Sequence, residues 1–364
     1  MAVVPQPIHN VAVVVPIRAA QPSRISVVIP VYNQPEHLEK CLAALTAASD
    51  LSEIIVVDDG STEDVHSVAK RAGVRYIRVP ERRGAAAARN RGWRAAHGEF
   101  IAFVDSDVVV GPNVLSHMRN LLNENPILAG IFGSYDDEPA DDNFYSQFRN
   151  LLHHYVHQVS KEQARTFWTG CGALRRSVLE EAGGFNEALP GMDDVELGMR
   201  LSGGGKLLFL DKSIQVKHLK KWTVASTVHT DIFLRAIPWT RLLAKMNVLP
   251  RDLNLGYRSR FSAVLVMLLF AIALLVPVSV VRGGWAASLP HYCVASAVMV
   301  LGLYYVNHGF YAFLARKRGL LFVSRAMAAH WFYYLYCGLT FLIVWSAARA
   351  DRLGPGTAGN HGRL

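Results

Sequence analysis

The stretch from Gly98 to Val110 constrains the fold most, because an apolar run there ends in two aspartates. Residues 100–104 (Phe-Ile-Ala-Phe-Val) predict a strand buried on both faces. Asp105 and Asp107 follow it one residue apart, so on an extended chain their side chains point the same way. Such a carboxylate pair suits a hard cation such as Mg²⁺ or Mn²⁺. An Asp-Ser-Asp sequence is also typical of a plain turn, so its surroundings must decide between the two interpretations.

The segments before this stretch alternate between apolar runs and helical periodicity. This alternation predicts a mostly parallel sheet with helices on both faces, as in Rossmann-like α/β folds. The expected strands are residues 25–31, 53–58, 74–79 and 100–104, and the expected helices are residues 36–48, 63–72 and 85–96.

A second acidic cluster, Asp58 and Asp59, stands at the end of the expected strand 53–58. In an open α/β sheet, ligands bind outside the carboxyl ends of the strands. The two acidic clusters are therefore expected to share one crevice.

The glycine-rich phosphate loops of common nucleotide sites are missing from the sequence. Residues 30–34 (Pro-Val-Tyr-Asn-Gln) follow the first strand, which disfavours a dinucleotide-binding dehydrogenase, and no P-loop motif occurs. Phosphates must then be held by a metal ion and by basic side chains. Arg89 and Asn90, in the basic cluster before the metal strand, are the strongest candidates.

Composition narrows the class of protein. Hydrophobic residues make up 51% of the 364 residues, and the mean hydropathy of +0.19 predicts that part of the chain lies in a membrane. The net charge of +9 suits anionic lipid or a phosphorylated substrate. No basic block is interleaved with aromatics, so a nucleic-acid partner is not expected. The four cysteines lie far apart, which argues against a zinc site or a disulfide framework.

A set of motifs resembles family 2 of the glycosyltransferases, which have the GT-A fold. The resemblance covers roughly the first two-thirds of the chain, and the motifs occur in the family's order. They are residues 27–33 (Val-Val-Ile-Pro-Val-Tyr-Asn), 56–62 (Val-Val-Asp-Asp-Gly-Ser-Thr), 87–92 (Ala-Ala-Arg-Asn-Arg-Gly), 103–107 (Phe-Val-Asp-Ser-Asp), 170–176 (Gly-Cys-Gly-Ala-Leu-Arg-Arg), 183–185 (Gly-Gly-Phe) and 192–200 (Met-Asp-Asp-Val-Glu-Leu-Gly-Met-Arg).

The resemblance implies a hexosyltransferase-like enzyme that uses a nucleotide-sugar donor, a UDP- or GDP-sugar, and inverts the anomeric carbon in one displacement. It places Pro30, Tyr32 and Asp58 or Asp59 near the base and ribose. It also places Asp105 and Asp107 at a divalent metal, Mn²⁺ or Mg²⁺, that bridges the diphosphate.

Inverting transfer needs a base that deprotonates the acceptor hydroxyl. Asp193 and Asp194 precede a helix expected to begin near Val195, where the helix N-terminus favours the ionised carboxylate. By its match to the family's Glu-Asp pair, Asp194 is the expected base, and Asp193 stands where the family usually has Glu. Asp194 as a simple helix cap is the alternative.

The segment 215–223 (Gln-Val-Lys-His-Leu-Lys-Lys-Trp-Thr) follows another expected strand, residues 207–210. In similar GT-A enzymes a histidine here contacts the metal or the diphosphate, so His218 is a candidate metal ligand. A structural hydrogen bond is the alternative role of His218. Lys221 and Trp222 are expected either to close over the donor or to dock the domain on the bilayer.

Two further segments bear on the acceptor and on processivity. The processive synthases related to this family carry a Gln-x-x-Arg-Trp motif near residues 215–223, and this chain has only Lys221-Trp222, which weakens a polymerase interpretation. Residues 135–165 are expected to form the acceptor side, and their histidines have no ligand partners at metal-site spacing.

The C-terminal third predicts a membrane domain over residues 251–350. Three stretches without Asp, Glu, Lys or Arg suggest spanning helices at residues 261–281, 286–305 and 326–348, with two spans as the fallback. Residues 310–327 are expected to form an interfacial amphipathic helix. Residues 1–22 and 351–364 are expected to be loosely ordered tails.

The distribution of positive charge predicts the orientation. Arginine and lysine flank the start of the first span and separate the second span from the third, which places the catalytic domain, residues 23–250, on the cytoplasmic side of the inner membrane. The expected function is transfer of a sugar to a lipid or membrane-associated glycan acceptor. The alternatives are a membrane-tethered sugar-nucleotide-binding or scaffold protein without transferase activity, or a processive polysaccharide synthase.

Overall fold

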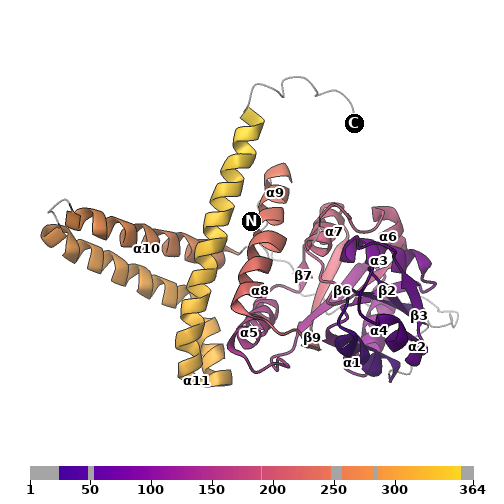
Figure 1. Cartoon of the computed structure of the whole chain (residues 1–364). Coiled ribbons are helices and arrows are strands. Elements are labelled where there is room, and N and C mark those ends of the chain that lie inside the picture. Colours follow the sequence, from indigo (N-terminus) through magenta and orange to yellow (C-terminus); the bar gives the residue numbers. More distant parts are fainter. Residues whose placement is uncertain (1–23, 48–52, 190, 247–255, 282–284, 354–364) are drawn as a thin grey trace, which may run out of the picture.

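A computed structural model describes residues 24–47, 53–189, 191–246, 256–281 and 285–353. The expected tails, apart from residues 351–353, lie outside the described residues. Figure 1 shows two parts, an α/β domain and a set of long C-terminal helices. The α/β domain holds the acidic motifs of the sequence.

One half of the sheet is parallel, as predicted. Its strands run in the order β3 (Arg75–Arg78), β2 (Glu53–Asp58), β1 (Ile25–Val31) and β4 (Phe100–Val104). Every residue of β1 and β4 is buried, which explains why both read as continuous apolar runs in the sequence. The predicted helices are confirmed with slightly shifted ends at α1 (Pro35–Thr46), α2 (Val65–Arg71) and α3 (Ala85–Ala95).

The other half of the sheet is mixed, so the parallel arrangement stops at β4. β8 (Cys171–Arg175) lies antiparallel to both β4 and β6 (Leu128–Tyr135), and β9 (Leu207–His218) is parallel to β6. The short strands β5 (Val108–Val109) and β7 (Gln163–Ala164) pair antiparallel with β9. The strand expected at 207–210 therefore continues through a register shift to His218, which is its last residue.

Two hydrophobic clusters, one on each face, hold this sheet. On one face, α1, α2 and α4 (Val114–Glu124) pack Leu42, Val68 and Met118 against the strands. On the other face, α3, α6 (Arg176–Ala182) and α7 (Asp193–Gly203) contribute Trp93, Leu179 and Leu197. The burial of both faces fixes the register, because a one-residue slip would turn apolar side chains outward.

Helix α5 (Phe144–Val159) joins the domain to the C-terminal helices. The imidazoles of His154 and His157 pair through Nδ1 with the backbone oxygens of Tyr135 and Gly133, at 2.9 and 3.1 Å. These histidines therefore attach α5 to β6. On its other side, α5 packs Phe148 against the C-terminal helices.

After the sheet, the chain forms α8 (Val224–His229), the π-helix η1 (Thr230–Ala236), α9 (Ile237–Met246), α10 (Tyr257–Val281) and α11 (Trp285–Leu353). Helix α11 bends at Gly319, whose φ of 77° is left-handed, so it consists of two arms. Figure 1 shows α10 beside the first arm, while the second arm runs in another direction past α9. The single helix expected over 310–327 is therefore interrupted, and both of its halves pack against α5.

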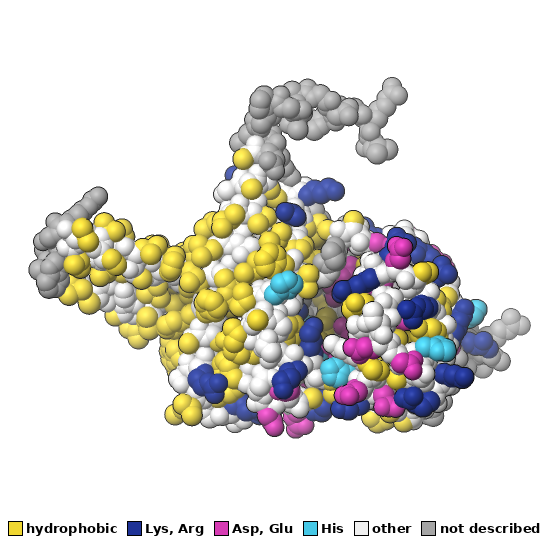
Figure 2. All heavy atoms as spheres, in the orientation of Figure 1, with side chains coloured by type: hydrophobic (Ala, Val, Ile, Leu, Met, Phe, Trp, Pro, Cys, Tyr) yellow, Lys and Arg dark blue, Asp and Glu magenta, His cyan; other side chains and the backbone are white. Residues whose placement is uncertain are grey.

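In the described part of the chain, two helices are long and apolar enough to cross a membrane, Tyr257–Val281 and Ser288–Ala350. Figure 2 shows hydrophobic side chains over much of the visible surface of α10 and α11, whereas charged side chains gather on the α/β domain. The three spans expected from the sequence fall on α10 and on the two arms of α11, and they stay a prediction.

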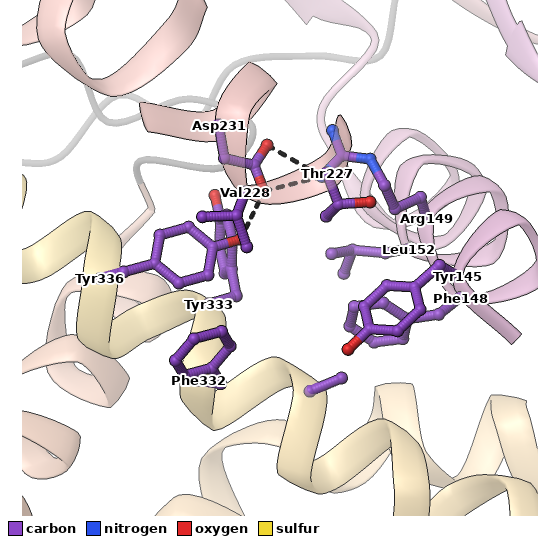
Figure 3. A pocket seen from close by; sticks show the side chains of 11 residues that line it. Tyr145, Phe148, Arg149, Leu152, Thr227, Val228, Asp231, Phe332, Tyr333 and Tyr336 are labelled. Atoms are coloured by element: carbon purple, nitrogen blue, oxygen red, sulfur yellow. Dashed lines mark hydrogen bonds and ion pairs between the residues drawn. The ribbon is translucent and has the colours of Figure 1, made fainter. Parts of the chain in front are cut away.

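A buried ion pair connects α5, η1 and α11. The Arg149 guanidinium donates from Nη1 to both carboxylate oxygens of Asp231 at 2.8 Å, and the Tyr336 hydroxyl donates to Asp231 at 2.6 Å. Figure 3 shows these groups at one end of a small cavity whose remaining walls are mostly apolar and aromatic. Asp231 is 2% exposed, so these partners offset the cost of burying the carboxylate.

Candidate active site

The acidic motifs meet at the carboxyl edge of the sheet. Asp105 and Asp107 follow β4, Asp58 ends β2, and His218 ends β9. Helix α7 begins at Asp193, so Asp193 and Asp194 occupy its first turn. The edge therefore gathers carboxylates from segments that lie far apart in the sequence.

Arg89 joins two of these carboxylates. Its guanidinium donates from Nη1 to Asp193 at 2.6 Å and from Nη2 to Asp105 at 2.8 Å. Arg89 and Asp193 are buried, with 6% and 3% of their surface exposed. Burial lowers the pKa of Arg89, but the charges of Asp193 and Asp105 outweigh it and raise that pKa overall. The expected phosphate-binding arginine thus faces carboxylates in this structure.

Asp107 and His218 form a second pair at this edge. His218 Nε2 lies 3.5 Å from a carboxylate oxygen of Asp107, and the imidazole stacks on the Tyr135 ring with a centroid distance of 4.0 Å. Burial raises the pKa of Asp107, but the neighbouring His218 outweighs it, and that pKa is lowered. The β5–β9 pairing fixes this arrangement, because Val108 lies opposite His218.

The donor set of Asp105, Asp107 and His218 fits a divalent cation in its chemistry. Carboxylate oxygens with one imidazole suit Mn²⁺ or Mg²⁺ and leave positions for phosphate oxygens. Within the described residues, no three His, Cys, Asp or Glu side chains are arranged to hold a metal ion, and Asp105 accepts a hydrogen bond from Arg89. The metal role of these residues remains a proposal.

Asp194 lies beside the segment that leads into β8. One carboxylate oxygen accepts from the Val195 backbone at 2.7 Å, and the other accepts from the Thr169 hydroxyl and backbone at 3.3 and 3.4 Å. Burial, followed by the charge of Asp193, raises the pKa of Asp194 to about 6. The N-cap residue of α7 is Met192, so Asp194 is not in the capping position. A carboxylate with such a pKa is suited to accept a proton near neutral pH.

Asp58 and Asp59 hold the loops beside β2. Asp58 accepts from the Ser61 backbone at 2.7 Å, the Tyr76 hydroxyl at 2.5 Å and the Arg78 guanidinium at 3.2 Å. Asp59 accepts from two backbone amides at 2.8 Å, those of Arg83 and Gly84, directly before α3. Both carboxylates are buried and hold the loops that border the carboxyl edge of the sheet.

The remaining expected donor-site residues near β1 differ in exposure. Pro30 is buried inside β1, opposite Val57 of β2. Tyr32 is 37% exposed, and the Arg82 guanidinium lies 3.9 Å from its ring centroid. Tyr32 and Arg82 therefore present an exposed flat surface at the end of the strand.

Asn90 is fully engaged by the protein. Its amide donates to the Phe185 backbone oxygen and to Glu187, both at 2.9 Å, and its oxygen accepts from the Trp93 indole at 3.0 Å. Asn90 is 2% exposed. The structure therefore gives Asn90 the task of attaching α3 to the loop after α6.

Trp222 is buried, with 6% of its surface exposed. Arg149 and Lys220 lie 4.4 and 4.3 Å from its ring centroid, and its backbone amide donates to Ser146 of α5 at 2.7 Å. The exposed Lys221 pairs with Asp141 at 3.4 Å. Trp222 therefore fixes the segment after β9 to α5, and its expected roles at the donor or at the bilayer stay predictions.

Sequence reasoning missed Trp168 and Thr169. They precede the Gly170-Cys171-Gly172 motif, and Thr169 is the residue that contacts Asp194. The Asp105 backbone amide donates to the Gly170 oxygen at 3.3 Å. Their place directly before a recognised motif is the only signal in the sequence.

The mixed sheet, with acidic groups gathered at the carboxyl edge of its strands, defines a GT-A-like α/β domain. Residues 26–183 match the profile of the family described as Glycosyl transferase family 2. This part of the chain is therefore a family 2 glycosyltransferase domain.

Curated relatives agree with this assignment over part of their length. The chain is 34% identical to glycosyltransferase GlyG of Streptococcus pneumoniae over 33% of this chain and 42% of that protein. It is 36% identical to glycosyltransferase AglE of Haloferax volcanii over 50% of this chain and 62% of that protein. The chain thus spans less than two-thirds of either relative.

One solved structure resembles most of the chain. It is the mannosyltransferase PcManGT from Pyrobaculum calidifontis in complex with GDP-Man and Mn²⁺. The likeness covers 91% of this chain and 88% of that chain, with a TM-score of 0.53 and 18% sequence identity. At this identity, the likeness supports the fold alone.

Proposed function

We propose that this protein is a membrane-anchored inverting glycosyltransferase that moves a sugar from a nucleotide-sugar donor to a lipid or membrane-associated glycan. One observation carries the proposal. Arg89 joins Asp105, beside the expected diphosphate site, to Asp193, the direct neighbour of the expected base. A leaving-group site with a base close beside it is what a single displacement requires.

Asp105, Asp107 and His218 would hold the divalent ion, which when bound neutralises charge on the leaving diphosphate. Asp194 accepts the proton of the acceptor hydroxyl as the acceptor oxygen bonds to the anomeric carbon. The bond from that carbon to the diphosphate oxygen breaks, and the nucleoside diphosphate leaves with the bonding electrons. Attack opposite the leaving group inverts the anomeric configuration.

The long apolar helices support the membrane part of the proposal. Lys317 at the end of the first arm of α11 pairs with Asp137 at 2.5 Å, and the neighbouring Arg318 donates to Gln147 at 2.7 Å. The α/β domain is thus attached at the bend of α11. Active-site residues held at this level would meet acceptors that reside in the bilayer.

A donor panel tests the proposal. The full chain in detergent, supplied with Mn²⁺ or Mg²⁺, GDP- and UDP-sugars and extracted membrane lipids, should form a labelled lipid or glycan product. Asp107→Asn should lose metal-dependent donor binding and transfer, whereas Glu124→Gln, at the exposed end of α4, should keep both. Wild type that neither binds nor turns over any donor would contradict the proposed activity.

A further inference from the structure

Trp168 lies between the two ends of the candidate site. Thr169, the next residue, contacts Asp194, and Gly170 accepts a hydrogen bond from the Asp105 backbone at 3.3 Å. On its other side, Trp168 contacts Tyr135, with a centroid distance of 4.8 Å, and the Tyr135 ring stacks on His218. Trp168 is thereby placed between the expected diphosphate position and the expected base.

The orientation of the Trp168 indole is fixed by its neighbours. A Cβ atom at Gly170 would lie 2.2 Å from the indole ring, so only glycine lets the ring lie against this backbone. Tyr135 meets the indole edge to face, at an interplanar angle of 88°, and His153 packs at 4.9 Å. A ring held in one orientation before binding loses little entropy when a ligand contacts it.

The indole is also not fully absorbed into the core. Trp168 packs against the hydrophobic clusters of both sheet faces, yet part of its surface stays exposed. Among the described residues, no group accepts a hydrogen bond from its indole nitrogen. The indole thus combines a fixed orientation with a partly exposed surface and an unused donor.

A hexose ring matches this chemistry. Its faces carry C–H groups that pack on an aromatic surface, and its rim carries hydroxyl groups that accept hydrogen bonds. A diphosphate also accepts hydrogen bonds, but it has no C–H face to pack on an aromatic ring, and its charge suits the divalent cation that the acidic residues would hold. Trp168 is therefore suited to a sugar ring, and its place between Asp105 and Asp194 is where the transferred sugar must lie.

We propose that Trp168, supported by Tyr135 and Gly170, is the surface on which the donor's sugar ring stacks. This proposal rests on the proposed transferase function and adds a sugar-binding residue to it. Trp168 then distinguishes nucleotide sugars from free nucleotides, because only nucleotide sugars carry the hexose ring. It is a binding residue, and it takes no part in the proton transfer.

The test compares two affinities in the full-length protein with Mn²⁺ in detergent. Calorimetry measures Kd for GDP-mannose, UDP-glucose and UDP-N-acetylglucosamine, and for GDP and UDP. For the sugar nucleotide that wild type binds most tightly, Trp168→Leu should raise Kd about 3- to 10-fold, as expected for loss of one aromatic contact. Kd for the matching free nucleotide should change less than about 2-fold, and Trp168→Tyr should restore much of the loss.

Controls separate this role from a purely structural one. Trp345→Leu removes another partly exposed tryptophan from the second arm of α11, away from the site, and should leave both affinities unchanged. Equal weakening of sugar nucleotide and free nucleotide by Trp168→Leu would show a distorted site and overturn the proposal. Unchanged donor affinity, with or without a raised KM for the acceptor, would overturn it as well. Wild type that binds none of these nucleotides would contradict the proposed function itself.

Discussion

The Arg89 guanidinium lies 2.6 Å from the Asp193 carboxylate, although the two residues are 104 positions apart in the sequence. The same guanidinium holds Asp105 at 2.8 Å, so one buried cation bridges the two acidic motifs of the site. A buried carboxylate left without its cation is strongly destabilising. The geometry of the edge therefore depends on a residue that the sequence assigns to phosphate binding.

Arg89→Ala should destabilise the α/β domain by about 3–5 kcal/mol, because Asp193 would remain buried and unpaired. Chemical denaturation in detergent measures this loss. Arg91→Ala, on the exposed face of the same helix, is the matched control and should change stability by less than about 0.5 kcal/mol. Equal stability of the two variants would contradict the bridging role.

Transferase activity should fall in mild acid, because the expected base Asp194 becomes protonated. Burial and Asp193 raise the pKa of Asp194 to about 6, so the ionised base is lost as pH falls through that value. The pH profile of kcat/KM should show an acidic limb with an apparent pKa near 6. A limb near the usual aspartate pKa would indicate that another group accepts the proton.

Ionisation of Asp194 should support activity but lower the stability of the fold. A folded-state pKa above the unfolded value of 3.8 means that ionised Asp194 costs stability, progressively as pH rises from about 4 through about 6. Asp194→Asn should therefore be more stable than wild type at pH 7.5, and the difference should shrink towards pH 4. Denaturation midpoints at both pH values provide the comparison. A variant less stable than wild type at pH 7.5 would contradict the cost of ionisation.

The strands, helices and acidic edge could be predicted from the sequence, because each depends on a pattern of neighbouring residues. The antiparallel direction of β8 could not be predicted, because a short apolar run is compatible with parallel and with antiparallel pairing. The burial of Trp222 could not be predicted either, because it depends on Arg149 of the distant helix α5, whose guanidinium lies 4.4 Å from the ring centroid. Contacts between distant segments could not be predicted from the sequence, and these contacts determine which groups Arg89 and Trp222 face.

The junction at Asp231 should be sensitive to loss of charge. Asp231→Asn would leave Arg149 largely buried without its carboxylate, and we expect a lower thermal midpoint in detergent. Arg235→Ala is the control, because Arg235 is more than half exposed and lies 3.9 Å from Asp231. If both variants melt alike, the Arg149–Asp231 pair does not hold the helices to the domain.

Reporter fusions test the orientation of the helices. A reporter after Arg318, beside the bend at Gly319, should report the cytoplasm, and one after Arg352 the opposite side. The second arm of α11 lies between the two fusion points. Both reporters on one side would mean that this arm does not cross the membrane.

Asp194→Asn tests the central claim most directly, since it keeps the size of the side chain and removes only the proton acceptor. On one preparation, calorimetry should show donor affinity nearly unchanged, while product formation falls by roughly 10²–10⁴-fold, the usual contribution of a general base. A purely structural role would leave transfer nearly intact, because asparagine keeps the side chain's size and an oxygen that accepts from the Val195 backbone. Transfer within a few-fold of wild type would remove Asp194 from the mechanism.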